Sequence, residues 1–281
     1  MDAAVLDHLR TWIGRSRSDE DVISVRHARL MAASVAYPPE KIGEGEPLPP
    51  LWHWLYFLEG LPPAELGRDG HPARGGFLPP VPLPNRMWAG GRVAFLQPVP
   101  LGATMRKESR ILKVEHKQGR SGDLVFVTVL HELVSMLGET CLREEHDIVY
   151  KEPAPVVAMP AGAMATKRQF TERFRPTSTT LFRYSALTFN GHRIHYDADY
   201  CREVEGYRNL VIHGPLVATM LAGLSEKVTK GNLVEFTYRG LAPAILGEGI
   251  SLQADVAGNV VELEAVLENG QVSMQARAVI R

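Results

Sequence analysis

The sequence predicts an α+β protein made of two halves, each with helices followed by an antiparallel sheet. Two series of strand-like segments alternate apolar and polar residues and are separated by glycine-containing turns. A helical stretch precedes each series, and a stretch rich in proline and alanine separates the two halves. An apolar helix that lies against an antiparallel sheet buries the apolar faces of both elements.

The first strand series follows Trp88 and the second lies at the carboxyl end of the chain. Because turn residues separate segments of alternating polarity, we expect long antiparallel strands in both series, forming two sheets or two halves of one sheet. The expected strands cover residues 92–99, 104–117, 123–136 and 141–150, then 233–240, 247–258, 259–270 and 271–281.

The two expected helical stretches begin alike, at Ser24 and Ser178, with an arginine at the sixth position and an alanine at the ninth. A second candidate helix follows each of them, over Leu51–Glu59 in the first half and over residues 214–227 in the second. The order of helix, helix and strands therefore occurs twice. One long apolar helix against an antiparallel sheet is the hotdog fold, so we expect a double hotdog of two fused units, each with a long apolar helix wrapped by its sheet.

The domain boundary is expected within residues 151–165, which gives an amino-terminal unit over 1–155 and a carboxy-terminal unit over 156–281. Twelve of the twenty prolines fall within residues 38–84 and prevent long regular elements there. The same region contains Trp52, Trp54 and Phe77. Because aromatic residues pack against other residues, we expect an ordered loop with short helical turns that covers a groove.

Composition excludes several classes of protein. The formal net charge of −1 lacks the basic excess that nucleic-acid binders use. Two cysteines, Cys141 and Cys201, are too few for a disulfide framework, which favours a reducing, cytoplasmic compartment. No signal-peptide pattern and no run of 18 apolar residues occurs, so we expect neither export nor a membrane span.

The densest group of polar residues is Tyr184–Asp197, which contains Asn190, His192 and His195. This segment resembles the motif of MaoC-like (R)-specific enoyl-CoA hydratases, in which an aspartate and a histidine five residues later frame the catalytic water. Asn190 and His195 match those two positions. The family's histidine-glycine pair at the start of the central helix is matched by His213 and Gly214.

Two further segments, residues 47–54 (PLPPLWHW) and 85–91 (NRMWAGG), resemble one subgroup of this family, the itaconyl-CoA and mesaconyl-CoA hydratases and mitochondrial-type hydroxyacyl-thioester dehydratases. The resemblance implies a double hotdog in which only one unit keeps the catalytic motif. Aligning Ser24 with Ser178 puts Ala36 opposite Asn190 and Lys41 opposite His195. We therefore expect the degenerate first unit to shape the pocket without supplying an acid or base.

The resemblance assigns catalytic roles to His195, Asn190 and Gly214. Since an amide accepts no proton at neutral pH, His195, with an ordinary pKa near ~6.5, is expected to be the acid and base, while Asn190 orients the water. The N–H of Gly214 at a helix start would stabilise negative charge on the thioester oxygen. His192 would tune His195 or bind substrate, and Asp197 would orient an imidazole or cap the next helix.

Substrate binding is expected from arginine and tryptophan side chains. Arg86 would pair with a substrate carboxylate and Trp88 would wall the pocket, although both are also consistent with packing the loop onto the sheet. Arg183 and Arg193 are the next candidate cations. No metal is expected, because His192, His195, Asp197 and Cys201 lack a familiar ligand spacing.

The resemblance implies a hydro-lyase that needs no cofactor and adds water to a short unsaturated dicarboxylic acyl-CoA, converting itaconyl-CoA or mesaconyl-CoA to citramalyl-CoA. One alternative is an (R)-3-hydroxyacyl-thioester dehydratase of fatty-acid metabolism. From another class, an acyl-CoA thioesterase or a non-catalytic acyl-CoA binding module also fits. The expected partner is an acyl-CoA thioester, with no nucleic acid and no membrane, and a homodimer is plausible because a sheet edge can pair.

Overall fold

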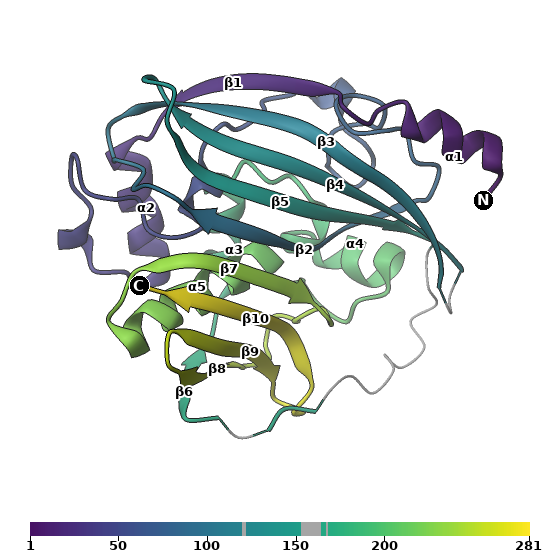
Figure 1. Ribbon diagram of the computed structural model, residues 1–281. Coiled ribbons are helices and arrows are strands. Elements are labelled where there is room, and N and C mark those ends of the chain that lie inside the picture. Colours follow the sequence, from purple (N-terminus) through teal and green to yellow (C-terminus); the bar gives the residue numbers. More distant parts are fainter. Residues whose placement is uncertain (120–121, 153–163, 167) are drawn as a thin grey trace.

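The computed structural model describes residues 1–119, 122–152, 164–166 and 168–281, and its main feature is one antiparallel sheet of ten strands (Figure 1). The strands lie in the order β1-β3-β4-β5-β2-β7-β10-β9-β8-β6. The first five are β1 (Ser16–Val22), β3 (Thr104–Gly119), β4 (Gly122–Ser135), β5 (Thr140–Lys151) and β2 (Asn85–Phe95). The other five are β7 (Leu233–Gly240), β10 (Val272–Ile280), β9 (Val260–Leu267), β8 (Ile250–Ala257) and β6 (Phe170–Phe174).

The two halves of the chain meet at the pairing of β2 with β7, where Gly90 lies opposite Arg239 and Ala94 opposite Glu235. The strand series expected from the sequence are therefore two halves of one continuous sheet. The α+β class and all eight expected strands are confirmed, although β2 begins seven residues earlier than predicted.

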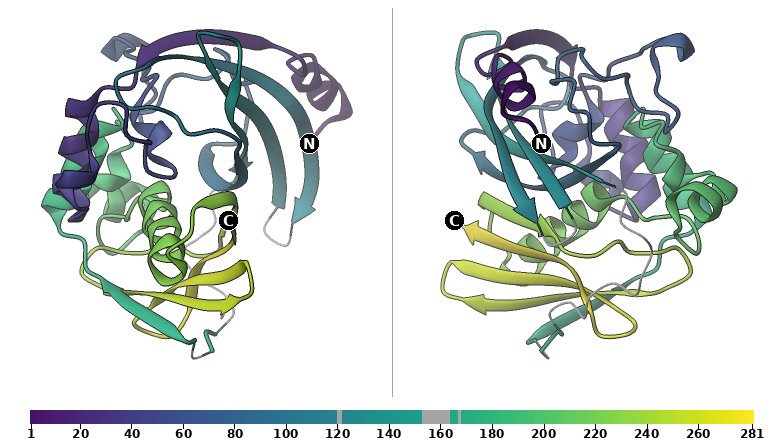
Figure 2. Two further views of the ribbon diagram at one scale, coloured as in Figure 1. Left: turned by 60° about the vertical axis from the view of Figure 1, so that its left-hand side comes forward. Right: turned by 90° about the vertical axis from the view of Figure 1, so that its right-hand side faces the viewer.

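The central helix of the second half, α5 (Gly214–Thr229), lies against β7, β8, β9 and β10 (Figure 2). Leu216, Leu221 and Leu224 of α5 are buried, which confirms that the apolar stripe of this helix faces the core. Helices α2 (Val25–Val35) and α3 (Ser178–Leu187), one from each half, pack against each other. His27 Nε2 hydrogen-bonds to the carbonyl oxygen of Leu187 at 2.7 Å and joins the two helices.

The helix predicted over Leu51–Glu59 is wrong. The structure has a four-residue 3₁₀ turn there, Trp52–Leu55, between Leu51 at φ 66° and Phe57 at φ 58°. Two left-handed residues so close together end any helix, and the aromatic residues between them have weak helix propensity. The first unit therefore has no long apolar helix among its described residues, and the aromatic segment itself fills the space under the sheet.

Three elements were not predicted: α1 (Ala3–Arg10) and the two outermost strands, β1 and β6. Strand β1 reads SRSDEDV, in which partly buried positions alternate with exposed ones but no apolar residue marks the buried face. Charges on an edge strand oppose pairing with another chain, so β1 is a poor edge for the homodimer expected from the sequence.

The region 38–84 is, as expected, ordered loop with short helical turns, namely Pro39–Lys41, Trp52–Leu55 and Pro63–Glu65. The predicted boundary between residues 155 and 156 lies outside the described residues. In the described part of the chain no helix is long and apolar enough to cross a membrane.

A buried carboxylate links the first-half loop to strands of both halves. Glu144 on β5 is 2% exposed and accepts hydrogen bonds from His53 Nε2 at 2.9 Å, Trp54 Nε1 at 3.0 Å and Tyr238 Oη at 3.4 Å. Burial raises the pKa of Glu144, but the hydrogen bond from His53 and the nearby imidazoles together lower it by a larger amount, so the net shift is downward. The residues of the PLWHW segment thus serve to satisfy an ionised group inside the protein.

We expect Glu144→Gln to lower the free energy of unfolding by about 1 to 3 kcal/mol, because the new amide NH₂ group faces donors it cannot pair with. Urea denaturation measures this loss. Glu145→Gln, which removes an exposed carboxylate paired with Arg92, is the matched control and should change stability by no more than about 0.5 kcal/mol.

The stability that ionised Glu144 contributes should be present above the ordinary glutamate pKa of about 4.3 and lost as pH falls toward its lower folded pKa. The wild-type protein should therefore lose more stability on acidification than Glu144→Gln. Parallel loss in the two proteins would contradict an ionised Glu144.

Candidate active site

A cavity with a volume of about 850 Å³ lies between the two halves. Its lining comes from loop 67–74, strands β2 and β5, the segment after α3 and the start of α5. Six of the predicted site residues line it: Arg86, Trp88, Asn190, His192, His195 and Gly214. The structure therefore brings most of the predicted site together, with residues of the first half among them.

His195 ends a 3₁₀ turn, Arg193–His195, and is 7% exposed. Its Nδ1 lies 2.7 Å from the carbonyl oxygen of Val211, which can only accept a hydrogen bond. Nδ1 therefore carries the proton, and Nε2 keeps a lone pair on a ring that lines the cavity. Burial lowers the pKa of His195 to about 4, against the opposing effect of the Val211 carbonyl. The pKa near 6.5 assumed from the sequence is thus too high, because it ignores desolvation.

His213, the residue before α5, holds the ring of His195 from one side. The two imidazoles stack with centroids 3.6 Å apart and an interplanar angle of 17°. His213 is fully buried, and its Nε2 hydrogen-bonds to Ser185 Oγ at 2.8 Å. His213 is therefore fixed to α3, and the stacked pair keeps His195 from turning.

Asn190 follows Phe189, a non-glycine residue at φ 48°. The side-chain oxygen of Asn190 accepts the backbone N–H of His192 at 2.9 Å, and the backbone N–H of Asn190 donates to Ser185 O at 2.8 Å. The amide NH₂ and the second lone pair of Oδ1 are therefore left to interact with a ligand. His192 lies between two other imidazoles, with its ring centroid 5.5 Å from that of His195.

Gly214 is the first residue of α5, where backbone N–H groups have no partner within the helix. A Cβ at this position would lie 2.8 Å from Cε3 of Trp88, so only glycine fits. Trp88 in turn stacks on Tyr238 at 4.5 Å and meets Trp54 edge-on at 5.9 Å. The tryptophan that walls the cavity is therefore held against the start of α5, beside an N–H able to stabilise an oxyanion.

Arg86 on β2 lines the cavity. Burial and the hydrogen bond between Asp69 and His71 have larger effects on the pKa values of these two residues, in opposite directions, and the positive charge of Arg86 lowers both pKa values. No ion pair within 4.0 Å joins Arg86 to a carboxylate of the described residues. A cation that lines a partly apolar cavity and lacks such a partner is suited to bind an anionic group of a ligand.

Two predicted arginines lie outside the cavity lining. Arg183 is an exposed residue of α3. Arg193 pairs with Asp197 at 2.7 Å and its guanidinium lies over the ring of Tyr200. Asp197 also caps the short helix α4 (Ala198–Tyr200) by accepting the N–H of Tyr200, which confirms capping over a partnership with an imidazole.

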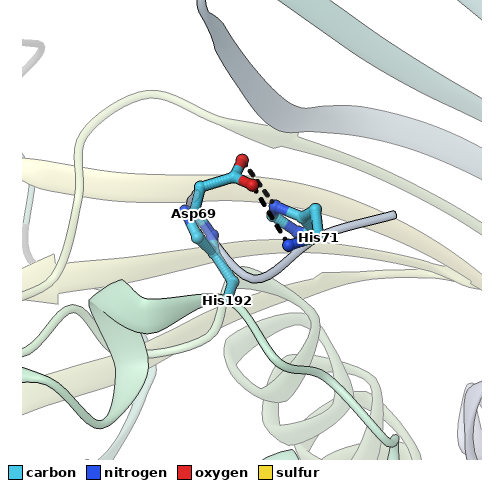
Figure 3. Close-up of side chains that lie close together, drawn as sticks. All are labelled: Asp69, His71 and His192. Carbon is cyan, nitrogen blue, oxygen red and sulfur yellow. Dashed lines mark hydrogen bonds and ion pairs between the residues drawn. The ribbon is translucent and has the colours of Figure 1, made fainter. Parts of the chain in front are cut away.

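The sequence did not predict Asp69 and His71, which come from the first half and lie beside His192 (Figure 3). Ala36 and Lys41, the residues aligned with Asn190 and His195, are exposed and do not line the cavity. The first half nevertheless supplies ionisable groups to the cavity. The signal in the sequence was the segment Asp69-Gly-His within the proline-rich cover.

Asp69, His71 and His192 are also the group of residues best arranged to hold a metal ion within the described residues, with ligand atoms within 4.8 Å of one another. The set considered from the sequence is not assembled. Asp197 faces Arg193, and Cys201 Sγ lies 3.1 Å from the carbonyl oxygen of Ile194.

Comparisons with known proteins give consistent matches. The family model described as "Hydroxyacyl-thioester dehydratase type 2" matches residues 51–246. A protein of Chloroflexus aurantiacus named mesaconyl-C(4)-CoA hydratase is 44% identical over 269 residues, covering 94% of this chain and 95% of that protein.

Two solved structures share the fold at low sequence identity. A MaoC-like dehydratase from Phytophthora capsici has a TM-score of 0.71 at 15% identity and covers 98% of both chains. A conserved Mycobacterium tuberculosis protein described as a double hotdog has a TM-score of 0.59 at 10% identity, covering 95% of this chain and 96% of that one. The double hotdog fold predicted from the sequence is confirmed, although within the described residues only the second unit has the long apolar helix that was expected in both.

We expect His195→Ala to lower kcat by about two to four orders of magnitude, because the ring whose Nε2 is available to move a proton is removed. Steady-state hydration kinetics measure the change, with thermal melts to verify folding. His8→Ala, which removes an exposed histidine of α1 outside the cavity, is the control. A folded His195→Ala variant with more than about a tenth of wild-type turnover would exclude the role.

The pH dependence should reflect the low pKa of His195. Because the neutral imidazole is the form that accepts a proton, and its pKa is lowered to about 4, kcat/KM should stay constant from neutral pH down to about 5. It should decline only as pH approaches 4. A decline centred near pH 6.5 in the wild-type profile would contradict the buried, desolvated state of this ring.

Proposed function

Because the chain belongs to the hydroxyacyl-thioester dehydratase type 2 family, we propose that it hydrates a short unsaturated dicarboxylic acyl-CoA, forming citramalyl-CoA from mesaconyl-CoA or itaconyl-CoA. The observation that carries the proposal is the 44% identity, over nearly the whole of both chains, to the protein named mesaconyl-C(4)-CoA hydratase. The arginine that lines the cavity supports it.

With mesaconyl-C4-CoA, whose double bond is conjugated with the thioester, the reaction needs a base, an acid and a site for negative charge. His195 Nε2 takes a proton from water while the oxygen bonds to the β-carbon of the enoyl thioester. The electron pair of the double bond moves toward the thioester carbonyl, whose oxygen the N–H of Gly214 stabilises. His195 then returns the proton to the α-carbon, so that one imidazole serves as base and acid.

The C4 thioester of mesaconate distinguishes this substrate from a fatty acyl thioester, since its free carboxylate is attached to the β-carbon. A carboxylate so close to the attacked carbon needs a positive group inside the cavity. Arg86 supplies that charge, and its planar guanidinium can offer two parallel donors to a carboxylate. Trp88 lines the same cavity beside Gly214.

The test is incubation with mesaconyl-C4-CoA and crotonyl-CoA, following loss of enoyl absorbance and, in parallel, release of free thiol. Preferred hydration of mesaconyl-C4-CoA without thiol release supports the proposal. Thiol release would indicate a thioesterase, and binding without turnover of either substrate would indicate an acyl-CoA binding module.

An (R)-3-hydroxyacyl-thioester dehydratase of fatty-acid metabolism is the second candidate, favoured by the description of the matching family. It would prefer crotonyl-CoA and longer enoyl chains, and it would not depend on Arg86. The homodimer and the cytoplasmic location expected from the sequence remain predictions.

We expect Arg86→Ala to reduce transition-state stabilisation for mesaconyl-C4-CoA by about 2 to 5 kcal/mol, measured as a fall in kcat/KM, because the substrate carboxylate loses its charged partner in a partly buried site. This is about 30-fold to several thousand-fold. Crotonyl-CoA lacks the carboxylate and should be nearly unaffected.

Arg183→Ala removes an arginine outside the cavity and should change neither substrate's kcat/KM. If Arg86→Ala lowers kcat/KM equally for the two substrates, Arg86 acts through the CoA or through the fold, and the dicarboxylate assignment loses its support.

A further inference from the structure

A carboxylate and an imidazole from the first half form a hydrogen-bonded pair at the wall of the cavity (Figure 3). Asp69 Oδ2 lies 3.1 Å from His71 Nδ1, and Asp69 Oδ1 accepts the backbone N–H of His71 at 3.1 Å. The ring of His71 lies next to that of His192, with centroids 4.1 Å apart. His71, His192 and His195 therefore form a row of three imidazoles.

The loop that carries this pair is fixed to the catalytic segment. The backbone N–H of Arg193 donates to Asp69 O at 2.9 Å, and Arg193 Nη1 donates to Arg68 O at 3.3 Å. Gly70 has φ +84°, and a Cβ there would overlap the carbonyl oxygen of Gly191. Because two glycines allow the backbones to touch, Asp69 and His71 have a defined position relative to Asn190 and His195.

The hydrogen bond to Asp69 determines the tautomer of His71. Asp69 accepts hydrogen bonds from both the backbone N–H and the ring Nδ1–H of His71, so Nδ1 carries the ring proton. The neutral ring then keeps its lone pair on Nε2. His71 is therefore a hydrogen-bond acceptor at the cavity wall, held in that form by a carboxylate.

The proposed hydration needs such an acceptor. A water whose lone pair points at the β-carbon directs both of its hydrogens toward the protein, and each hydrogen needs an acceptor. His195 Nε2 accepts one of them. Asn190 is a weaker acceptor for the other than the aspartate of the common motif, because the N–H of His192 occupies one of the two lone pairs of its Oδ1 and its remaining group is a donor.

We propose that His71 Nε2 accepts the second hydrogen of the attacking water, so that the first half replaces the carboxylate acceptor that position 190 lacks. This inference rests on the proposed function as a hydratase. His71 is then a catalytic residue that transfers no proton: the proton that leaves the water goes to His195 and returns to the α-carbon. Asp69 is a positioning residue that keeps the lone pair on Nε2.

A double-mutant cycle of His71→Ala and Asn190→Asp tests the proposal. We expect His71→Ala to lower kcat by up to about 100-fold with little change in KM, because the water is no longer oriented. A carboxylate at position 190 can accept the second hydrogen, so the same His71→Ala substitution should cost much less kcat in the Asn190→Asp background. A role of His71 in packing alone would not be relieved by a carboxylate at another residue.

Asp69→Asn is the second variant. Because an amide can hydrogen-bond to either tautomer of His71, this substitution should also lower kcat, as His71→Ala does. Thermal melts of each variant verify folding, and His8→Ala is the control. An unchanged kcat in folded His71→Ala would overturn the proposal, as would an equal loss in the two backgrounds. Loss of activity with EDTA, restored by a divalent metal, would also overturn it by making Asp69, His71 and His192 metal ligands.

The cycle uses whichever of mesaconyl-C4-CoA and crotonyl-CoA the wild-type protein hydrates faster. A preference for crotonyl-CoA would contradict the dicarboxylate assignment while leaving the cycle interpretable. Loss of the coupling between positions 71 and 190 would contradict the water-orienting role while leaving the substrate assignment intact.

Discussion

The ionised carboxylate of Glu144 needs donors inside the protein, and satisfying it constrains much of the structure around the cavity. An ionised group so deeply buried is tolerated only while its hydrogen bonds are made. Its donors come from the first-half loop, through His53 and Trp54, and from strand β7 of the second half, through Tyr238. The carboxylate therefore holds together parts of the chain nearly two hundred residues apart in sequence.

The same donors form the wall of the cavity. Trp54 and Tyr238 each contact Trp88, which in turn lies against Gly214 at the start of α5. A change at Glu144 would alter the support of the tryptophan next to the candidate oxyanion donor. Stability and the geometry of the cavity thus depend on one polar network, in the way that buried networks specify a single arrangement of their neighbours.

The sequence predicted those elements whose buried faces repeat with a regular period. Strands such as β9 alternate apolar and polar residues, and α5 has an apolar stripe, so each could be recognised from its own residues. Strand β1 lacks apolar residues on its buried face, and the aromatic segment at Trp52–Leu55 takes its conformation from long-range packing. Neither is determined by the local pattern, which is why one was missed and the other was predicted as a helix.

The candidate site divides in the same way. Asn190, His192 and His195 are close in sequence, and a short turn is enough to bring them together. Asp69 and His71 join them only because the backbone at Gly70 touches that at Gly191, a contact between halves that no local pattern contains. The low pKa of His195 also follows from burial by distant residues and not from its sequence neighbours.

The pairing of β2 with β7 makes one sheet of two similar units that belong to a single chain. In a homodimer of identical units with two-fold symmetry, every substitution appears in both units, so a site and its symmetry-equivalent site must change together. Covalent fusion removes that requirement. One unit here keeps Asn190 and His195, while its counterpart has exposed Ala36 and Lys41 at the matching places and has a proline-rich loop that lines the shared cavity. Fusion thus permits one asymmetric site, with the catalytic segment from one unit and the lining loop from the other. A symmetric assembly of identical units would contain such a site twice.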